Sequence, residues 1–111
     1  MAQTVVVGNR VITLGVYRHF KGRHYLVVDA VRDCNTLEYK VLYSSLYDDK
    51  KKGIKCGDLF YRGVQEFFSP TDKVKYPNAT QDQRFKFIMG IDEFLSITSM
   101  NDIAELLTYM R

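Results

Sequence analysis

Two β-rich runs joined by a short polar turn constrain this 111-residue chain more than any other feature. Residues 25–31, YLVVDAV, carry apolar side chains at both odd and even positions, which is typical of a strand buried on two faces. In residues 38–44, EYKVLYS, the apolar side chains of Tyr39, Val41 and Tyr43 alternate with mostly polar ones, which predicts a strand with one face more exposed to water. Residues 33–36 between them favour a turn, because short polar side chains bond nearby backbone groups. We therefore expect an antiparallel hairpin at the centre of the fold.

A second hairpin is predicted at the N-terminus. Residues 4–7 and 10–14 are rich in β-branched side chains, and Gly8-Asn9 between them accepts the positive φ of a two-residue turn. This hairpin has apolar edges that invite pairing with another chain, so we expect a homo-oligomer formed through it or through the C-terminal helix.

The rest of the chain completes a β domain with a helical end. We predict short strands over 59–62 and 85–88, a turn or another strand over 64–68, and a solvated loop over 48–57. A helical turn is expected at Ile91, Phe94 and Leu95. An amphipathic helix should follow, with its apolar stripe at Ile103, Leu106, Leu107 and Met110.

Length and composition predict one globular domain of the mostly β (α+β) class, a small SH3-like or curled β-barrel. We divide the chain into a β core over 15–88, an added hairpin over 1–14 and a helical extension over 91–111. The net charge of +3 permits an anionic partner but is too small for a dedicated duplex binder. No apolar run is long enough to span a bilayer, so we expect no membrane partner and a cytoplasmic protein. Cys34 and Cys56 form no CxxC pair and are expected to be free thiols.

Cationic and aromatic residues gather in residues 17–24, YRHFKGRH, and recur on later strands. Arginine binds phosphate through a planar fork, lysine adds a point charge, and an aromatic ring stacks on a base. The predicted ligand-binding residues are Tyr17, Arg18, His19, Lys21, Arg32 and Arg62. In the alternative interpretation the arginines pair with Asp29, Asp33 or Glu38, and Tyr17 and Phe20 belong to the core.

The same stretch resembles a short bacterial and phage family that is a domain of unknown function. Its pattern runs YRHxKG, RHxxTxE, YxxLY and WVRPxxMF, and residues 17–22, 32–38, 43–47 and 60–67 of this chain are similar to these motifs. This chain differs in having Asp33 in place of the usual His, Gly63 in place of Pro, and Tyr61 near the usual Trp-Val. The resemblance covers about Gly15 to Ile88 and implies a small β-barrel-like domain; it also favours a functional role for Arg18, His19, Lys21 and Arg62.

We therefore predict a binding module for a phosphorylated ligand, such as a nucleotide-type small molecule. Phage members of the resembling family suggest one form of this function: a sponge in the host cytoplasm that sequesters a signalling nucleotide and counters a defence system. The alternatives are a nucleic-acid-binding domain, a protein-interaction module and a small nucleotide hydrolase. No phosphate-loop, dinucleotide or zinc-protease motif is present, and His19, His24, Cys34 and Cys56 lack zinc-finger spacing. We accordingly expect neither a catalytic residue nor a metal or cofactor.

Overall fold

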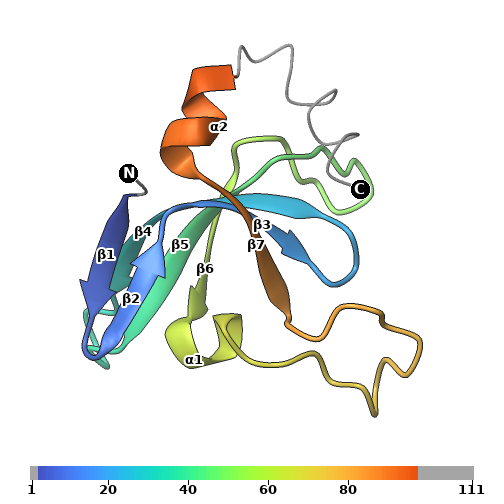
Figure 1. The fold of residues 1–111 in the computed structure, drawn as a ribbon, viewed down its shortest axis with the longest axis horizontal. Coiled ribbons are helices and arrows are strands. Elements are labelled where there is room, and N and C mark those ends of the chain that lie inside the picture. Colours follow the sequence, from blue (N-terminus) through green and yellow to red (C-terminus); the bar gives the residue numbers. More distant parts are fainter. Residues whose placement is uncertain (1–2, 98–111) are drawn as a thin grey trace.

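The computed structural model describes residues 3–97, which form a five-stranded antiparallel sheet, a separate two-stranded hairpin and two short helices (Figure 1). The elements in chain order are β1 Thr4–Val7, β2 Arg10–Thr13, β3 Gly15–His19, β4 His24–Arg32, β5 Tyr39–Ser45, β6 Leu59–Gly63, α1 Val64–Phe67, β7 Phe85–Gly90 and α2 Ile91–Ile97. The prediction of a mostly β fold is confirmed. The amphipathic helix predicted around residues 103–110 lies outside the described residues.

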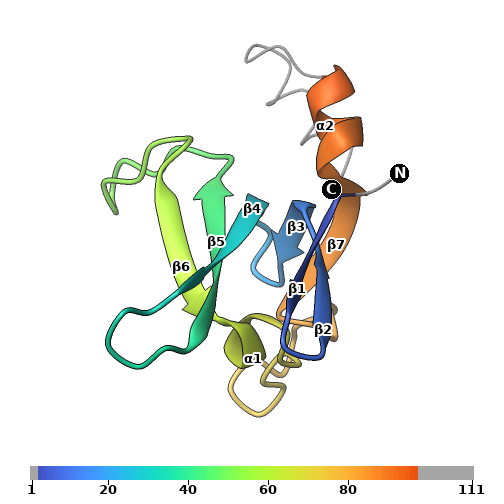
Figure 2. The ribbon, with the colours of Figure 1, turned by 90° about the vertical axis from the view of Figure 1, so that its left-hand side faces the viewer.

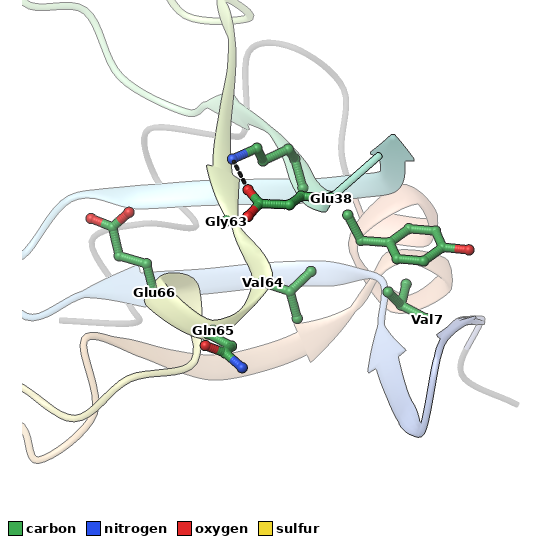
Figure 3. Close-up of a pocket in the computed structure, with 8 residues that line it drawn as sticks. Val7, Glu38, Gly63, Val64, Gln65 and Glu66 are labelled. Atoms are coloured by element: carbon green, nitrogen blue, oxygen red, sulfur yellow. Dashed lines mark hydrogen bonds and ion pairs between the residues drawn. The ribbon is translucent and has the colours of Figure 1, made fainter. Parts of the chain in front are cut away.

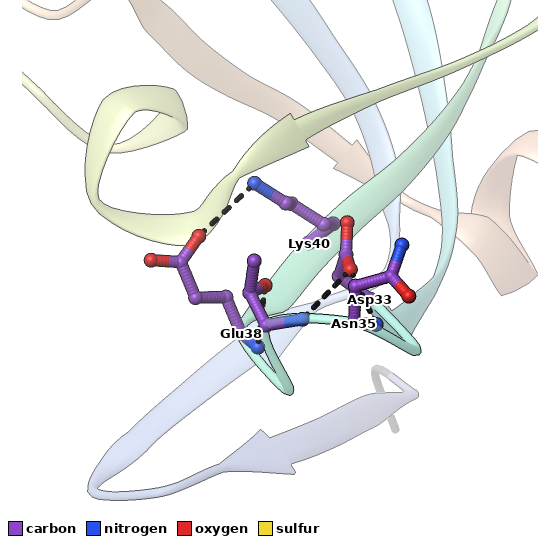
Figure 4. Close-up of polar contacts among 5 residues, drawn as sticks. Asp33, Asn35, Glu38 and Lys40 are labelled. Carbon is purple, nitrogen blue, oxygen red and sulfur yellow. Dashed lines mark hydrogen bonds and ion pairs between the residues drawn. The ribbon is translucent and has the colours of Figure 1, made fainter.

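Both predicted hairpins are present. In the first, Val7 of β1 pairs with Arg10 of β2, so Gly8 and Asn9 form a two-residue turn in which Gly8 has a φ of 58°. In the second, β4 pairs with β5, and Asp33 begins the turn between them. The Asp33 carboxylate accepts hydrogen bonds from the backbone N–H groups of Asn35 and Thr36 at 2.8 and 3.0 Å, which fixes the turn (Figure 4).

The burial predicted for β4 is wrong at its far end. Val27 is fully buried, whereas Val31 is 37% exposed. β3 pairs with β4 only as far as Val27, so the remaining residues of β4 extend beyond β3 and are covered less completely. The register of the β4–β5 pair also shifts between Val27 and Asp29, which marks a bulge where the strand changes its surroundings.

The strand order of the large sheet is β6-β5-β4-β3-β7, and the sheet is strongly curled (Figure 2). We call the face that carries Tyr17, Tyr43 and Phe85 the inner face; it packs against the N-terminal hairpin and α1. The outer face carries Val16 and Leu46, and Phe94 of α2 covers them. β6 and β7 remain separate edges, so the sheet curls as expected but does not close into a barrel.

Residues 64–67 form a helical turn, α1, instead of continuing a strand. Val64, Phe67 and Phe68 are spaced at i, i+3 and i+4, so one helical turn places all three apolar side chains on one side. Phe67 is fully buried and its ring stacks on Phe85 at 4.0 Å between centroids. α1 therefore packs Phe67 into the core of the inner face, and Figure 2 shows this helix between the end of β6 and the N-terminal hairpin.

Neither α1 nor α2, the helices of residues 3–97, combines the length and apolar composition needed to cross a membrane.

Candidate ligand-binding site

β3 divides the cationic motif between the two faces of the sheet. Successive side chains of a strand point to opposite faces, so Tyr17 and His19 lie on the inner face and Arg18 on the outer face. The contacts agree with this alternation, because Tyr17 packs on Phe67, His19 packs on Phe85, and Arg18 lines a hollow with Lys86. The predicted ligand-binding residues of this motif therefore do not form one surface.

Tyr17 belongs to the core. Its side chain is 4% exposed, and its hydroxyl donates a 2.7 Å hydrogen bond to the backbone carbonyl of Thr13. Burial raises the pKa of Tyr17 to about 12. The structure thus places Tyr17 beneath the inner surface, as in the alternative interpretation of the sequence, where it supports the residues that reach solvent.

Arg62 joins the two edges of the curled sheet through its side chain. It lies on β6, and its guanidinium sits 5.7 Å from the centroid of the Phe85 ring on β7. The Arg62 Nε donates to the Tyr43 hydroxyl at 3.3 Å, and Nη1 contacts the Glu66 carboxylate at 2.8 Å. The Arg62 side chain is 28% exposed, and these partners hold its guanidinium in a defined orientation over an aromatic floor.

Burial alone would lower the pKa of Arg62, but the Tyr43 hydroxyl and the Glu66 carboxylate together raise it. The guanidinium therefore stays charged although it is half-buried. Its partners use the Nε–H group and one N–H group of Nη1. The planar guanidinium has further N–H groups with which to bind an anion.

His19 is the second polar group on this surface. Burial, and then the charges of Arg62, Lys21 and Arg84, lowers the pKa of His19 to about 4, so the ring is neutral near pH 7. The Nδ1 atom accepts a hydrogen bond from the backbone N–H of Lys21 at 3.1 Å. A neutral imidazole that accepts at Nδ1 carries its proton at Nε2, so His19 presents a hydrogen-bond donor.

Tyrosines border the site along β4 and the end of β5. Tyr25 contacts Tyr43, Phe85 and Tyr47, with ring centroids 5.1, 5.9 and 5.4 Å apart, and its hydroxyl lies 2.7 Å from that of Tyr47. Burial and this hydrogen bond raise the pKa of Tyr25, so it is a neutral phenol at physiological pH. We call His19, Tyr25, Tyr43, Arg62 and Phe85 the inner site: Tyr43 and Phe85 form its buried floor, and the other three reach solvent.

Further cations surround the inner site. Arg23 lies 4.6 Å from the centroid of the Tyr47 ring and 3.8 Å from the Asp49 carboxylate. Lys21 lies 4.9 Å from the centroid of the Tyr76 ring in the loop between α1 and β7. The charges that act on His19 are three cations, whereas Glu66 is the carboxylate that contacts Arg62. Three cations therefore act on His19, and their charges favour an anionic ligand beside this ring.

Arg32 lies apart from the inner site. It stacks over Tyr39 at 4.3 Å, and these two residues face one another at the end of the β4–β5 hairpin. The three carboxylates proposed as partners of Arg18 and Arg32 make other contacts. Glu38 contacts Lys40 at 3.3 Å, Asp33 caps its own turn, and Asp29 accepts a hydrogen bond from the backbone N–H of Ala30 at 2.8 Å. Of the six predicted ligand-binding residues, the structure therefore brings together His19, Arg62 and, at the border, Lys21.

A groove of about 590 Å³ runs beside the inner site between the N-terminal hairpin, the start of β5 and α1. Figure 3 shows Val7 on one side of this groove and Val64, Gln65 and Glu66 on the other. Glu66 belongs to the groove and also contacts Arg62, so the groove adjoins the inner site at this carboxylate. A ligand at Arg62 would have space to extend along α1.

Three residues of the surroundings were missed by the sequence analysis: Tyr25, Glu66 and Arg84. Tyr25 was interpreted as a strand residue only, and its contact with Phe85 joins segments 60 residues apart. Arg84 precedes the predicted closing strand and donates from Nε to Ser69 Oγ at 3.1 Å. Arg62 lies near the end of β6 and Glu66 lies on α1, so their ion pair depends on the junction between this strand and this helix, which no local pattern indicated.

Within residues 3–97, no three His, Cys, Asp or Glu side chains gather closely enough to hold a metal ion. Cys34 and Cys56 are free thiols, as predicted, and Cys34 is exposed.

The fold and the inner site define a small, curled β domain whose concave surface is aromatic and cationic. The chain belongs to the family described as "Protein of unknown function (DUF1653)", which matches residues 15–87. A crystal structure of a protein belonging to the same family, from Bordetella bronchiseptica, is similar to this chain with 29% sequence identity and a TM-score of 0.54. The similarity covers 70% of this chain and 88% of the Bordetella chain. A search of curated proteins finds no match.

Proposed function

We propose that this domain binds a phosphorylated aromatic ligand, such as a nucleotide, at the inner site and releases it chemically unchanged. The observation that carries the proposal is the position of Arg62, whose charged guanidinium is held at the surface between aromatic rings by Tyr43 and Glu66. A structural ion pair would need only Glu66. The additional hydrogen bond and the aromatic floor support a role in which the guanidinium is oriented for a ligand.

The other groups of the inner site supply complementary interactions. Neutral His19 offers a donor at Nε2, and the charges of Arg62, Lys21 and Arg84 around it favour a phosphate. The exposed parts of Tyr25 and Tyr47 offer ring surfaces on which a base can stack, and such stacking contributes about 1–3 kcal/mol per base. These interactions are those of a binding site, and we propose binding without turnover.

The experiment is a calorimetric titration of the full chain with a panel of nucleotides, cyclic oligonucleotides and short single strands, followed by mass analysis of each ligand. Arg62→Ala should weaken the bound nucleotide by about ten- to a hundredfold, because a hydrogen bond to a charged group contributes about 1.5–3 kcal/mol. Arg32→Ala is the matched control, since it also removes an arginine stacked on an aromatic ring. It should leave the affinity within about twofold, because its effect on the potential at the inner site is screened.

Three results would contradict the proposal: no nucleotide binds, Arg32→Ala weakens binding as much as Arg62→Ala, or the recovered ligand has changed in mass. The last result would identify a hydrolase. Selective binding of single strands with a steep salt dependence would instead identify a nucleic-acid-binding domain, because such affinity falls with the number of phosphates contacted.

A further inference from the structure

The outer face carries a second hollow, beneath the loop that leads into β7 and on the opposite side of β3 from the inner site. It has a volume of about 480 Å³. Its lining residues are Arg18, Thr80, Gln81, Asp82, Gln83 and Lys86. Arg18 and His19 are neighbours in the sequence, so one strand contributes a cationic residue to this hollow and a histidine to the inner site.

Two cations on neighbouring strands, Arg18 and Lys86, line this hollow side by side. Arg18 on β3 is in register with Lys86 on β7, and side chains in register lie on the same face of the sheet. Within residues 3–97, neither side chain forms an ion pair. Asp82 also lines the hollow, but its side chain is 90% exposed and its carboxylate contacts Lys73 at 3.4 Å. Like charges in register destabilise a sheet, so the hollow favours an anion as a counter-charge.

Two of the residues that line the hollow each carry a buried polar atom, one a donor and one an acceptor, that lacks a partner in the described residues. These atoms are Arg18 Nε and Gln81 Oε1, and Gln81 is only 9% exposed. The Gln81 amide cannot be turned around, because its Nε2 donates to the carbonyls of Arg18 and Gln83 at 2.9 and 2.7 Å. An unsatisfied buried polar atom destabilises the fold, so a ligand that pairs with both atoms offsets this loss.

We propose that this hollow, which we call the outer site, binds a protonated phosphate group. Oxygens of the phosphate accept hydrogen bonds from Arg18 Nε and from Lys86, and its P–OH group donates to Gln81 Oε1. Inorganic phosphate and a phosphate monoester both offer this combination of charge, acceptor and donor. Sulfate offers the charge and the acceptors but no proton, so it leaves Gln81 Oε1 unpaired. The outer site is separate from the inner site, and the proposal does not depend on the function proposed there.

The test is an NMR titration of ¹⁵N-labelled protein in which the Arg18 Nε–H signal is observed directly. It is made at about pH 6, where a phosphate monoester with its second pKa near 6 is about half protonated, and at constant ionic strength. The probes are inorganic phosphate, glycerol phosphate and sulfate. Both phosphates should shift the Arg18 signal saturably, and sulfate should bind at least about tenfold more weakly because it cannot satisfy Gln81.

Lys86→Gln is the informative variant, because the exposed Lys86 side chain can be replaced without disturbing the core. The variant should lower the affinity for phosphate by about tenfold, since one charge-assisted contact is lost. Lys50→Gln, which removes an exposed lysine from the 48–57 loop, should leave the phosphate affinity unchanged. If glycerol phosphate binds more tightly than phosphate, the natural ligand is a monoester that fills more of the hollow; the reverse order identifies a site for free phosphate.

The proposal is overturned if neither phosphate shifts the Arg18 signal, if sulfate matches phosphate, or if Lys50→Gln weakens phosphate as much as Lys86→Gln does. Such a result would not affect the proposal for the inner site, because that proposal is tested separately by nucleotide binding and the Arg62→Ala variant.

Discussion

The inner and outer faces of β3 use cationic residues in different ways. On the inner face, Arg62 is supported by hydrogen bonds and aromatic rings, and the surrounding groups are mostly satisfied. On the outer face, Arg18 Nε and Gln81 Oε1 are buried without partners in the described residues. The inner face therefore resembles a rigid surface that is oriented before a ligand arrives, whereas the outer hollow gains hydrogen bonds only when a ligand arrives. The following variants separate these two behaviours.

Gly15→Ala should have the largest effect and should damage both faces together. Gly15 has a φ of 152°, and an added Cβ would collide with the backbone carbonyl of Met89 on β7. Because backbone atoms cannot move aside as a side chain can, we expect a loss of roughly 4 kcal/mol or more in the free energy of unfolding. Urea denaturation of the wild-type and variant proteins measures this change.

Gly63→Ala is the matched control for that variant. Gly63 has a φ of −54°, and the nearest atom to an added Cβ is Lys40 Nζ at 4.0 Å. The control should change stability by no more than about 0.5 kcal/mol. Equal stability of the two variants would show that β3 and β7 do not approach as closely as described.

Phe67→Ala should damage the inner face selectively. Phe67 is fully buried and stacks on Phe85, which lies beneath Arg62. Removing a buried phenylalanine costs about 3–5 kcal/mol. If the domain remains folded, nucleotide binding should weaken while the phosphate-induced shift of Arg18 persists. Equal loss at both sites in folded protein would mean that the faces are not independent.

The smallest expected effect is the pH dependence contributed by His19. Its pKa is about 4 in the folded protein against an ordinary value of 6.5, so the unfolded chain binds the proton more readily. The stability contributed by neutral His19 is therefore present above about pH 6.5 and is lost as the pH falls toward 4.

His19→Asn should flatten the stability profile between these pH values, because asparagine does not titrate and retains an acceptor for the Lys21 N–H. Urea denaturation at a series of pH values measures the profile. An unchanged slope in the variant would contradict the lowered pKa. A bound phosphate ligand should raise the pKa of His19, since an anion favours the charged ring.

Much of the β framework could be predicted from the sequence because the signals are local. Alternation in residues 38–44 and the Gly8-Asn9 turn each specify a hairpin without distant contacts. β3 was not predicted, because Gly15 interrupts the apolar run and Arg18 and His19 conceal the strand pattern. Without β3, the motif was interpreted as one cationic cluster, although successive side chains of this strand point to opposite faces of the sheet. The contact of Arg62 with Phe85 depends on the curl of the whole sheet, which no local pattern encodes.

The most direct test of this account is one NMR titration that follows the Nε–H signals of Arg62 and Arg18 in the same sample. The protein is first saturated with inorganic phosphate and then titrated with a cyclic dinucleotide, whose phosphodiester groups carry no P–OH proton and so lack the donor that the outer site requires. We expect Arg18 to respond to phosphate, and Arg62 and His19 to respond to the nucleotide with a separate binding curve. A single curve shared by Arg18 and Arg62, or a nucleotide that moves neither, would contradict the division of the two sites by β3.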